Sequence, residues 1–551
     1  MNSATRRPRA GFAALVAAGI LLSRLSGFVR QKIFSYYLGN SDAAGVFSAA
    51  YRIPNFLQNL FGEGVLSASF IPVYARLLAE GEEELAGRVA GIIASLLALT
   101  VAILVLIGVL LTPWLLIVIA PGFKGEAREL TIVVVRILFP GIGLLVLSSW
   151  CLGILNSHRK FFVSYVAPVL MNIVMIATLV MFGGRVNDRA LAVWASWGTV
   201  IGAGAQLGIQ VPFVFRYAKH LRFAIDTALE PVRQIVKNFT PVVIARGVVQ
   251  LSAYLDNLLA TLLGTAAASA LSYAQLIALL PVSLFGMSVA AAELPQMSAT
   301  LGSEEDIHAA LRNRMTGGLR QIAFFVIPSV VAYIAIGHAI VAALYQGGRF
   351  KTDDTLYVWY ILIGSTVGLL AATLGRLYSS AFYALRDTRT PLRFAILRVA
   401  LTGILGYLFA LPLRPLLIDA LQFAGVPLPL IQGSTKSLGA IALTATAGVA
   451  GWLEFILLRR ALGRRIGPVP LSRGYLMRLW TSAIIAGIAG AAFYAFVTPR
   501  LGQYLPRFLP YIRDGLIVCA IFGVIYFAMA WALGVPEARA TVGRFLLRSS
   551  R

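Results

Sequence analysis

Cysteine and histidine are scarce in this sequence. Among 551 residues there are two cysteines and four histidines. Cys151 and Cys519 both lie inside apolar runs, and the histidines are scattered without the spacing that metal ligands require. The sequence therefore predicts no disulfide, no metal site and no cofactor.

The chain also lacks a polar stretch long enough to form a soluble domain. Charged residues make up only 13% of it, hydrophobic residues make up 59%, and the mean hydropathy is +0.81. A water-soluble protein of this length is far less apolar. Segments of about 20 apolar residues, enough to cross a bilayer, recur from end to end. We therefore expect an all-α polytopic membrane protein.

The apolar segments predict about fourteen transmembrane helices. They lie near residues 11–38, 46–78, 88–119, 129–155, 163–183, 190–216, 235–263, 268–299, 318–345, 356–384, 392–412, 438–459, 477–497 and 513–534. Basic residues are mostly denser in the loops that this alternation assigns to the cytoplasm. An even number of spans then places both termini in the cytoplasm.

Acidic residues are few beside basic ones. There are 23 against 47 lysines and arginines, a net charge of +24. The basic residues fall in short clusters between apolar runs, as membrane orientation requires, so we expect a membrane partner and no nucleic acid.

Arg6, Arg7 and Arg9 before an apolar run imitate a signal peptide. The run continues through Arg24 without a cleavage motif, which predicts an uncleaved first helix.

An internal repeat suggests two similar halves. The stretch "FGEGVLSASFIP" at 61–72 resembles "FGMSVAAAELP" at 285–295. Each lies in the second span of a six-helix half, an arrangement used by transporters. We expect an N-terminal lobe at 1–220, a second lobe at 221–465, and a C-terminal helix pair with a tail at 466–551, the two lobes surrounding a central cavity.

Ionisable residues inside predicted spans are the sharpest functional signal, because each costs about 2.5–3.5 kcal/mol at a helix centre. They are Arg24, Arg30, Arg52, Glu63, Arg136, Arg246, Asp256, Arg376 and Arg398. Arginines outnumber carboxylates, so internal pairing leaves positive charge over. A surplus of fixed positive charge in a cavity favours an anionic substrate.

The guanidinium group suits phosphate because its planar fork donates two parallel hydrogen bonds and stays charged. Arg24 and Arg30 are six residues apart, about 240° around an ideal helix. We expect a break at Ser26 and Gly27 that turns both side chains into a wet cavity, and a similar kink at Pro54. An alternative for both arginines is that they reach the membrane interface.

The seventh span carries a polar stripe, because Arg246, Gln250 and Asn257 fall on one helical face. Arg246 is a candidate ligand and Gln250 a supporting residue. Glu63 and Asp256 either balance arginines or carry a coupling proton. Alternatives remain for the other arginines: Arg52 lies near a helix end, Arg136 and Arg398 can bond helix carbonyls, and Arg376 can anchor a loop.

Four segments together resemble the MurJ (MviN) family of lipid II flippases, within the multidrug/oligosaccharidyl-lipid/polysaccharide exporter superfamily. They are "SRLSGFVRQKIF", "YRIPNFLQNLFGEGVLSASFIPVYARLL", "VRILFPGIGLLVLSSWCLGILNSHRKFFVSYVAPVLMNI" and "SAFYALRDTRTP". The resemblance covers nearly the whole chain.

This resemblance implies a bacterial inner-membrane transporter, not an enzyme. It would move lipid II, a pyrophosphate-linked glycolipid, from the cytoplasmic to the periplasmic leaflet by alternating access, for peptidoglycan synthesis. Two six-helix lobes would surround a cationic cavity, and the last two helices would hold the polyprenyl tail. Arg24, Arg30 and Arg52 would bind substrate, and Glu63 matches the family's acidic residue. An ion or the membrane potential would drive transport.

The sequence departs from the family pattern at several charged positions. Gln31 stands where an acid usually follows the second arginine, Gln58 and Asn59 stand where basic residues precede the acidic motif, and Leu276 replaces an arginine. We hypothesise that Arg246 substitutes for the last of these.

Other functions stay open beside lipid II transport. One is a flippase for another polyprenyl-pyrophosphate glycan, such as an O-antigen or capsule unit, and another is a non-transporting membrane scaffold. A membrane glycosyltransferase is disfavoured, because it requires a carboxylate or metal site on an external loop. The only candidate there is "KTDD" at 351–354.

Overall fold

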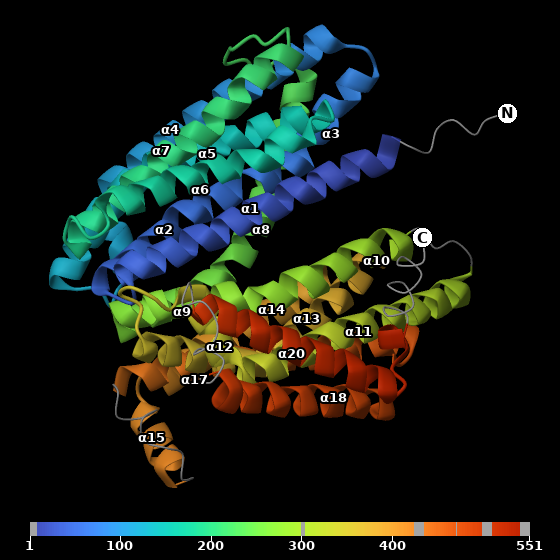
Figure 1. Cartoon of the computed structure of the whole chain (residues 1–551). Coiled ribbons are helices and arrows are strands. Elements are labelled where there is room, and N and C mark those ends of the chain that lie inside the picture. Colours follow the sequence, from blue (N-terminus) through green and yellow to red (C-terminus); the bar gives the residue numbers. More distant parts are fainter. Residues whose placement is uncertain (1–7, 299–302, 424–434, 470, 499–509, 540–551) are drawn as a thin grey trace. The chain divides into compact units, whose positions relative to one another are not determined.

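A computed structural model describes residues 8–298, 303–423, 435–469, 471–498 and 510–539 (Figure 1). These residues are almost entirely helical and contain no β-strand. The prediction of an all-α polytopic membrane protein is confirmed. Eleven of the described helices are long and apolar enough to cross a membrane, and the total of fourteen spans remains a prediction.

The chain divides into two compact units, residues 1–269 with 348–350, and residues 270–347 with 351–551. The predicted three-part division at 220 and 465 stays a prediction. Unit 1 contains α1 (Pro8–Leu38), α2 (Asp42–Phe61), α3 (Glu63–Ala79), α4 (Glu83–Ile119), α5 (Gly125–Ser157), α6 (Phe161–Phe182), α7 (Asp188–Tyr217) and α8 (Glu230–Leu263).

Helix α9 (Thr265–Pro281) starts in unit 1 and continues into unit 2. Unit 2 then contains η1 (Val282–Met287), α10 (Ser288–Ser298), α11 (Glu304–Ala335), α12 (Gly337–Tyr345), α13 (Thr352–Ala384), α14 (Arg389–Ala410), α15 (Arg414–Phe423), α17 (Thr435–Ile466), α18 (Arg473–Ala492), η2 (Phe493–Val497) and α20 (Pro510–Ala532). Each of the fourteen predicted ranges falls on one of these helices or on a consecutive group.

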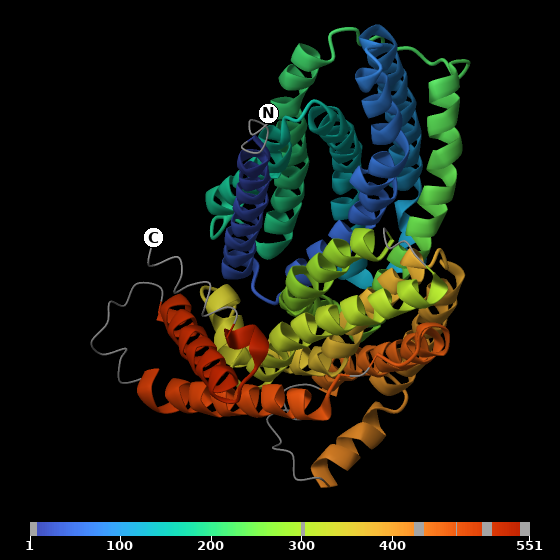
Figure 2. The same ribbon diagram turned by 90° about the vertical axis from the view of Figure 1, so that its right-hand side faces the viewer.

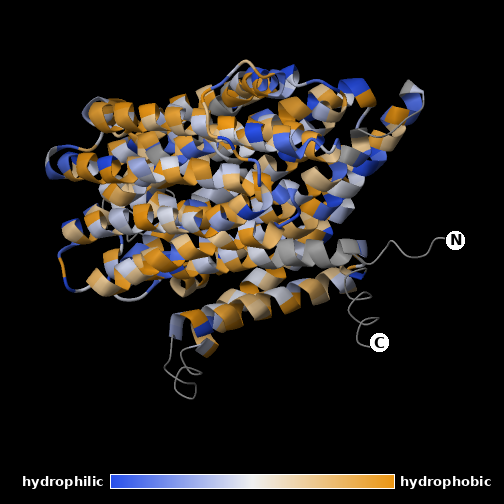
Figure 3. Cartoon of the chain, turned by 90° about the horizontal axis from the view of Figure 1, so that it is seen from above, coloured by the Kyte–Doolittle hydropathy of each residue, from blue (hydrophilic) through white to orange (hydrophobic). Residues whose placement is uncertain are grey.

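Helices pack side by side within each unit. In unit 1, α5 lies against α7, α2 and α4, and α6 lies against α1 and α7. In unit 2, α17 packs on α13 and α14, and α18 runs beside α20 (Figure 2). Hydrophobic residues run along the helices, and many hydrophilic ones lie at helix ends (Figure 3). This is the distribution expected of membrane-spanning helices.

A glycine pair allows a close helix crossing in unit 2. A Cβ atom added to Gly368 of α13 would lie 2.4 Å from the Cα atom of Gly448 of α17. Small residues let membrane helices approach closely when no hydrophobic effect drives them together. The α13–α17 contact therefore depends on both residues remaining glycine.

Both copies of the internal repeat lie where a helix is irregular. Gly62 separates α2 from α3 in unit 1, whereas η1 forms wider turns within one continuous helix that runs from α9 into α10 in unit 2. Discontinuous helices mark substrate regions in transporters, and the junction at Gly62 is such a discontinuity. Helix α2 runs through Pro54 and ends at Phe61, and the expected kink at Pro54 stays a prediction.

Loops assigned to the same side of the membrane meet in the structure. Arg349 pairs with Asp188, and its backbone N–H donates to Tyr36 O at 2.9 Å, so three loops assigned outside lie together. On the other side, Arg222 lies 3.4 Å from Glu84, joining two loops assigned inside. These contacts agree with the predicted alternation of the spans.

Candidate functional site

Helix α1 carries Arg24 and Arg30, the two arginines expected to bind phosphate. It is continuous from Pro8 to Leu38, so the expected break at Ser26 and Gly27 is wrong. Ser26 Oγ donates to Ser23 O at 2.9 Å and accepts a hydrogen bond from Asn172 Nδ2 of α6 at 2.8 Å. These bonds hold a regular helix against its neighbour, so nothing there requires unwinding.

Because α1 is regular, Arg24 and Arg30 point in different directions from its axis, about 120° apart by the shorter way around the helix. Arg24 is exposed and Arg30 is half-buried. The structure therefore spreads the two guanidinium groups around α1 instead of aiming both at one point.

Arg52 of α2 meets the predicted acidic residue of α8. Its half-buried side chain interacts electrostatically with Asp256 and Tyr254. The rings of Phe56 and Tyr254 meet edge to face 5.0 Å apart, which fixes α2 against α8. This neighbourhood favours the reading in which Asp256 balances an arginine.

Three predicted site residues are described by their backbone alone. Arg246 and Gln250 lie on α8, and Glu63 begins α3 directly after Gly62. Their side chains lie outside what the structure describes. The hypothesis that Arg246 substitutes for a missing arginine, and the roles of Gln250 and Glu63, therefore stay predictions.

A polar pocket of about 410 Å³ lies inside unit 1 among α2, α3, α5, α6 and α7. The lining residues are Gln58, Asn59, Gly64, Ser67, Ser148, Ser149, Leu152, Ser164, Pro168 and Gln206. Asn59 and Ser67 are exposed and form its mouth, whereas Ser148, Ser164 and Gln206 are buried and form its floor. Two of the departures from the family pattern, Gln58 and Asn59, thus lie in its wall.

A hydrogen-bond network supports the floor of the polar pocket. Gln206 Nε2 donates to Ser148 Oγ at 2.9 Å, and Ser148 Oγ donates to Gln210 Oε1 at 2.7 Å. These residues were not predicted from the sequence, because only ionisable residues within the spans were considered as candidates. The signal available was Gln206 and Gln210 four residues apart, on one face of an apolar helix.

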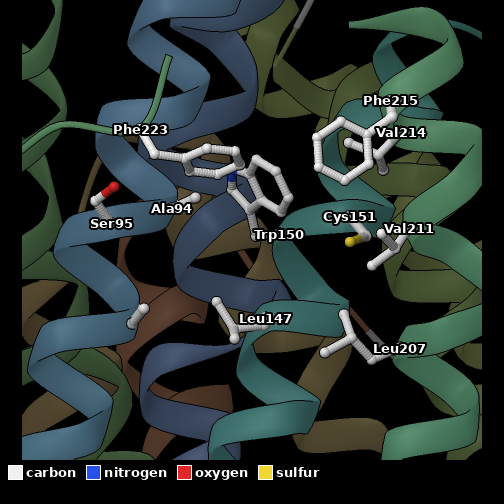
Figure 4. Close-up of a pocket in the computed structure, with 11 residues that line it drawn as sticks. Ala94, Ser95, Leu147, Trp150, Cys151, Leu207, Val211, Val214, Phe215 and Phe223 are labelled. Atoms are coloured by element: carbon white, nitrogen blue, oxygen red, sulfur yellow. The ribbon is translucent and has the colours of Figure 1, made fainter. Parts of the chain in front are cut away.

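A second pocket in unit 1, of about 270 Å³, is almost wholly apolar (Figure 4). Trp150 and Cys151 of α5 face it, together with Phe215 at the end of α7 and Phe223 in the following loop. Ser95 Oγ already donates to the carbonyl oxygen of Gly91. This pocket offers nothing to hold a polar headgroup and suits a hydrocarbon chain.

Two of the remaining arginines have structural partners. Arg136 Nε donates to Val109 O at 3.2 Å, as the carbonyl-bonding alternative expected. Arg398 Nε of α14 lies 3.3 Å from Glu454 Oε2 of α17, a carboxylate that the sequence reasoning did not single out. Neither contact requires a substrate.

Two helical units, helix irregularities in both copies of the repeat, arginines on membrane helices and a polar pocket inside one unit are features of a membrane transporter. The profile of the family described as lipid II flippase MurJ matches residues 34–512. The chain belongs to this family. Such flippases are transporters and do not catalyse a chemical reaction.

Similar proteins extend along nearly the whole chain. A probable lipid II flippase MurJ of Rhizobium tropici is 30% identical over 537 residues, 94% of this chain and 93% of the relative. The lipid II flippase MurJ of Burkholderia cenocepacia is 26% identical over 536 residues, 95% of this chain and 97% of the relative.

Solved structures share the fold. Lipid II flippase MurJ in an inward closed conformation matches with a TM-score of 0.73 at 21% identity, covering 94% of this chain and 98% of that one. An inward-facing multidrug resistance MATE transporter of the MOP superfamily matches with a TM-score of 0.60 at 19% identity, covering 82% and 98%.

Proposed function

We propose that this protein moves lipid II from the cytoplasmic to the periplasmic leaflet of the bacterial inner membrane by alternating access. The observation that carries the proposal is the family match over residues 34–512. The predicted orientation, with both termini in the cytoplasm, belongs to the same proposal. Its energy source would be an ion gradient or the membrane potential.

In this proposal the pyrophosphate binds arginines of unit 1. Arg24 is exposed on α1 and Arg30 is half-buried, so a ligand can reach Arg24 fully and Arg30 in part. Guanidinium groups bind pyrophosphate through paired hydrogen bonds and strong charge attraction. Asp256 partly balances the positive charge of Arg52, so Arg52 attracts an anion less strongly and is the weakest candidate of the three. Arg246 completes the proposed set.

Complementation of a flippase-depleted bacterium tests the proposal. Wild type should restore growth and expose labelled lipid II in the outer leaflet, and Arg24→Ala and Arg30→Ala should abolish both. The matched control is Arg136→Ala, because Arg136 bonds to a backbone carbonyl. Full complementation by Arg24→Ala and Arg30→Ala would contradict the proposed role of these arginines.

The role of Arg246 has its own test. Arg246→Ala should reduce lipid II exposure about as strongly as Arg30→Ala. Unchanged complementation by Arg246→Ala, beside loss with Arg30→Ala, would remove Arg246 from the site. Wild type that restores neither growth nor lipid II exposure would favour a scaffold or a flippase for a different glycan.

A further inference from the structure

We infer that the polar pocket of unit 1 binds a neutral sugar unit of the lipid-linked substrate. The inference rests on the proposed function and adds a second binding element to it, separate from the arginines. It follows from four properties of the pocket: the absence of charge among its described lining residues, the kinds of hydrogen-bonding group, a hydroxyl group on its floor without a described partner, and size.

None of the ten described residues that line the pocket carries a charge. Among these described residues a phosphate or carboxylate group would find no guanidinium or ammonium partner, and burial without one is strongly unfavourable. The pocket therefore selects against the anionic part of the substrate and leaves that part to the arginines.

The polar lining presents amides and hydroxyl groups. Gln58, Asn59 and Gln206 each offer both a donor and an acceptor, and the serine hydroxyl groups do the same. Sugar hydroxyl groups also donate and accept at once. Leu152 and Pro168 add an apolar wall, which suits the C–H face of a sugar ring.

Ser164 supplies the observation that points most directly to a ligand. It lines the pocket from the first turn of α6 and is only 1% exposed, and its Oγ atom has no hydrogen-bond partner among the described residues. Behind the floor, Gln210 Nε2 is likewise buried and unpartnered within the described part of the chain. Buried polar groups in native proteins nearly always have a partner, so these atoms require water or ligand.

The volume of about 410 Å³ falls in the range of roughly 300–1,000 Å³ found for small-molecule sites. This volume is larger than a single bare cation needs. The exposed residues Asn59 and Ser67 form an opening through which a headgroup can enter. Under the predicted orientation, Ser164 and the C-terminal halves of α5 and α7 lie toward the cytoplasm, the side from which the substrate comes.

The test compares two lipids that differ only in the sugar. The full chain in nanodiscs is titrated with labelled lipid II and with a labelled polyprenyl pyrophosphate of equal chain length that carries no sugar. We expect wild type to bind lipid II more tightly. Ser164→Ala and Asn59→Ala should each weaken lipid II binding about three- to tenfold, the value of one hydrogen bond, and leave the sugar-free lipid unaffected.

The variants are chosen to preserve the fold. Ser164→Ala removes a hydroxyl group that no described residue uses, and Asn59 is exposed. The control Ser196→Ala removes a buried serine of α7 whose Oγ donates to Ala192 O of its own helix, and it should change neither affinity.

The outcomes separate the two ideas. If wild type binds and flips lipid II but both pocket variants keep wild-type affinity, the pocket holds only water and the inference is overturned. Equal loss for both lipids would also overturn it, because the sugar would then not be the group recognised. If wild type neither binds nor flips lipid II, the proposed function fails, and the inference fails with it.

Discussion

Arg398 Nε of α14 lies 3.3 Å from Glu454 Oε2 of α17, and the same carboxylate interacts electrostatically with Arg376 of α13. Three helices of unit 2 thus share one acidic side chain, of which only 17% is exposed. Charged side chains within membrane helices are stable when they face such partners. The group explains two arginines of unit 2 without a substrate.

Glu454→Leu should lower the stability of unit 2. Loss of the carboxylate leaves Arg398 without its ion-pair partner, and we expect a cost of about 1–2 kcal/mol, as for polar contacts between membrane helices. Thermal unfolding in detergent measures it. The double variant Arg398→Leu/Glu454→Leu should recover most of the loss, because a well-packed apolar pair can replace an ion pair. If Glu454→Leu melts at the wild-type temperature, the pair is energetically unimportant; if the double variant melts as low as the single one, the unpaired charge is not the cause of the loss.

Asp387, from the family-like segment "SAFYALRDTRTP", should make stability depend on acid pH. Hydrogen bonds from the backbone N–H and the hydroxyl group of Thr390, together with Arg465 at 2.6 Å, hold the pKa of Asp387 below its ordinary value of 3.8. Its stabilising effect is complete above that value and disappears as the pH falls through the lowered pKa.

The test is Asp387→Asn, followed by thermal unfolding from pH 7 to pH 3. The variant should be about 0.5–2 kcal/mol less stable at pH 7, the usual loss for a side chain that caps a helix start. The difference from wild type should shrink below pH 4. A difference that stays constant over this range would exclude titration of Asp387 as its cause.

Ser26→Ala should loosen α1 from α6. The change removes the acceptor of the 2.8 Å hydrogen bond from Asn172 Nδ2, at a cost of about 1 kcal/mol. Because α1 carries Arg24 and Arg30, lipid II exposure should fall with stability. The control is Ser95→Ala, whose Oγ donates to Gly91 O in its own helix. If both variants behave alike, the Asn172 contact does not hold α1.

Gly62→Ala should disturb the junction between α2 and α3. A Cβ atom there would lie 2.3 Å from Gln58 O and 3.1 Å from Ser149 Oγ. Relieving such an overlap costs about 1–3 kcal/mol, measurable as a lower melting temperature. The matched control is Gly208→Ala, since a Cβ atom on Gly208 meets no described atom within 4 Å. A melting temperature unchanged by Gly62→Ala would contradict a tight junction.

The helices were predictable, and much of the candidate site was not. Runs of apolar residues fix where helices cross a bilayer, so each predicted range coincides with helical structure. The expected break beside Ser26 failed because local pattern does not reveal the bond from Asn172, 146 residues away. Glu454 was overlooked although it lies inside a predicted span. The polar pocket combines neutral residues from several helices, and only tertiary packing reveals that they meet.

Helix α1, which carries two of the proposed pyrophosphate ligands, has its main packing partner more than a hundred residues later in the chain. Helix α1 packs against α6, which the ribosome makes later, whereas α8 packs against α2, α3 and α4, which it makes earlier. We therefore expect tertiary packing to form out of chain order: α1 reaches its final packing only after α6 emerges, and a nascent chain that ends before α6 should leave the α6-facing side of α1 more accessible to labels than the full chain does.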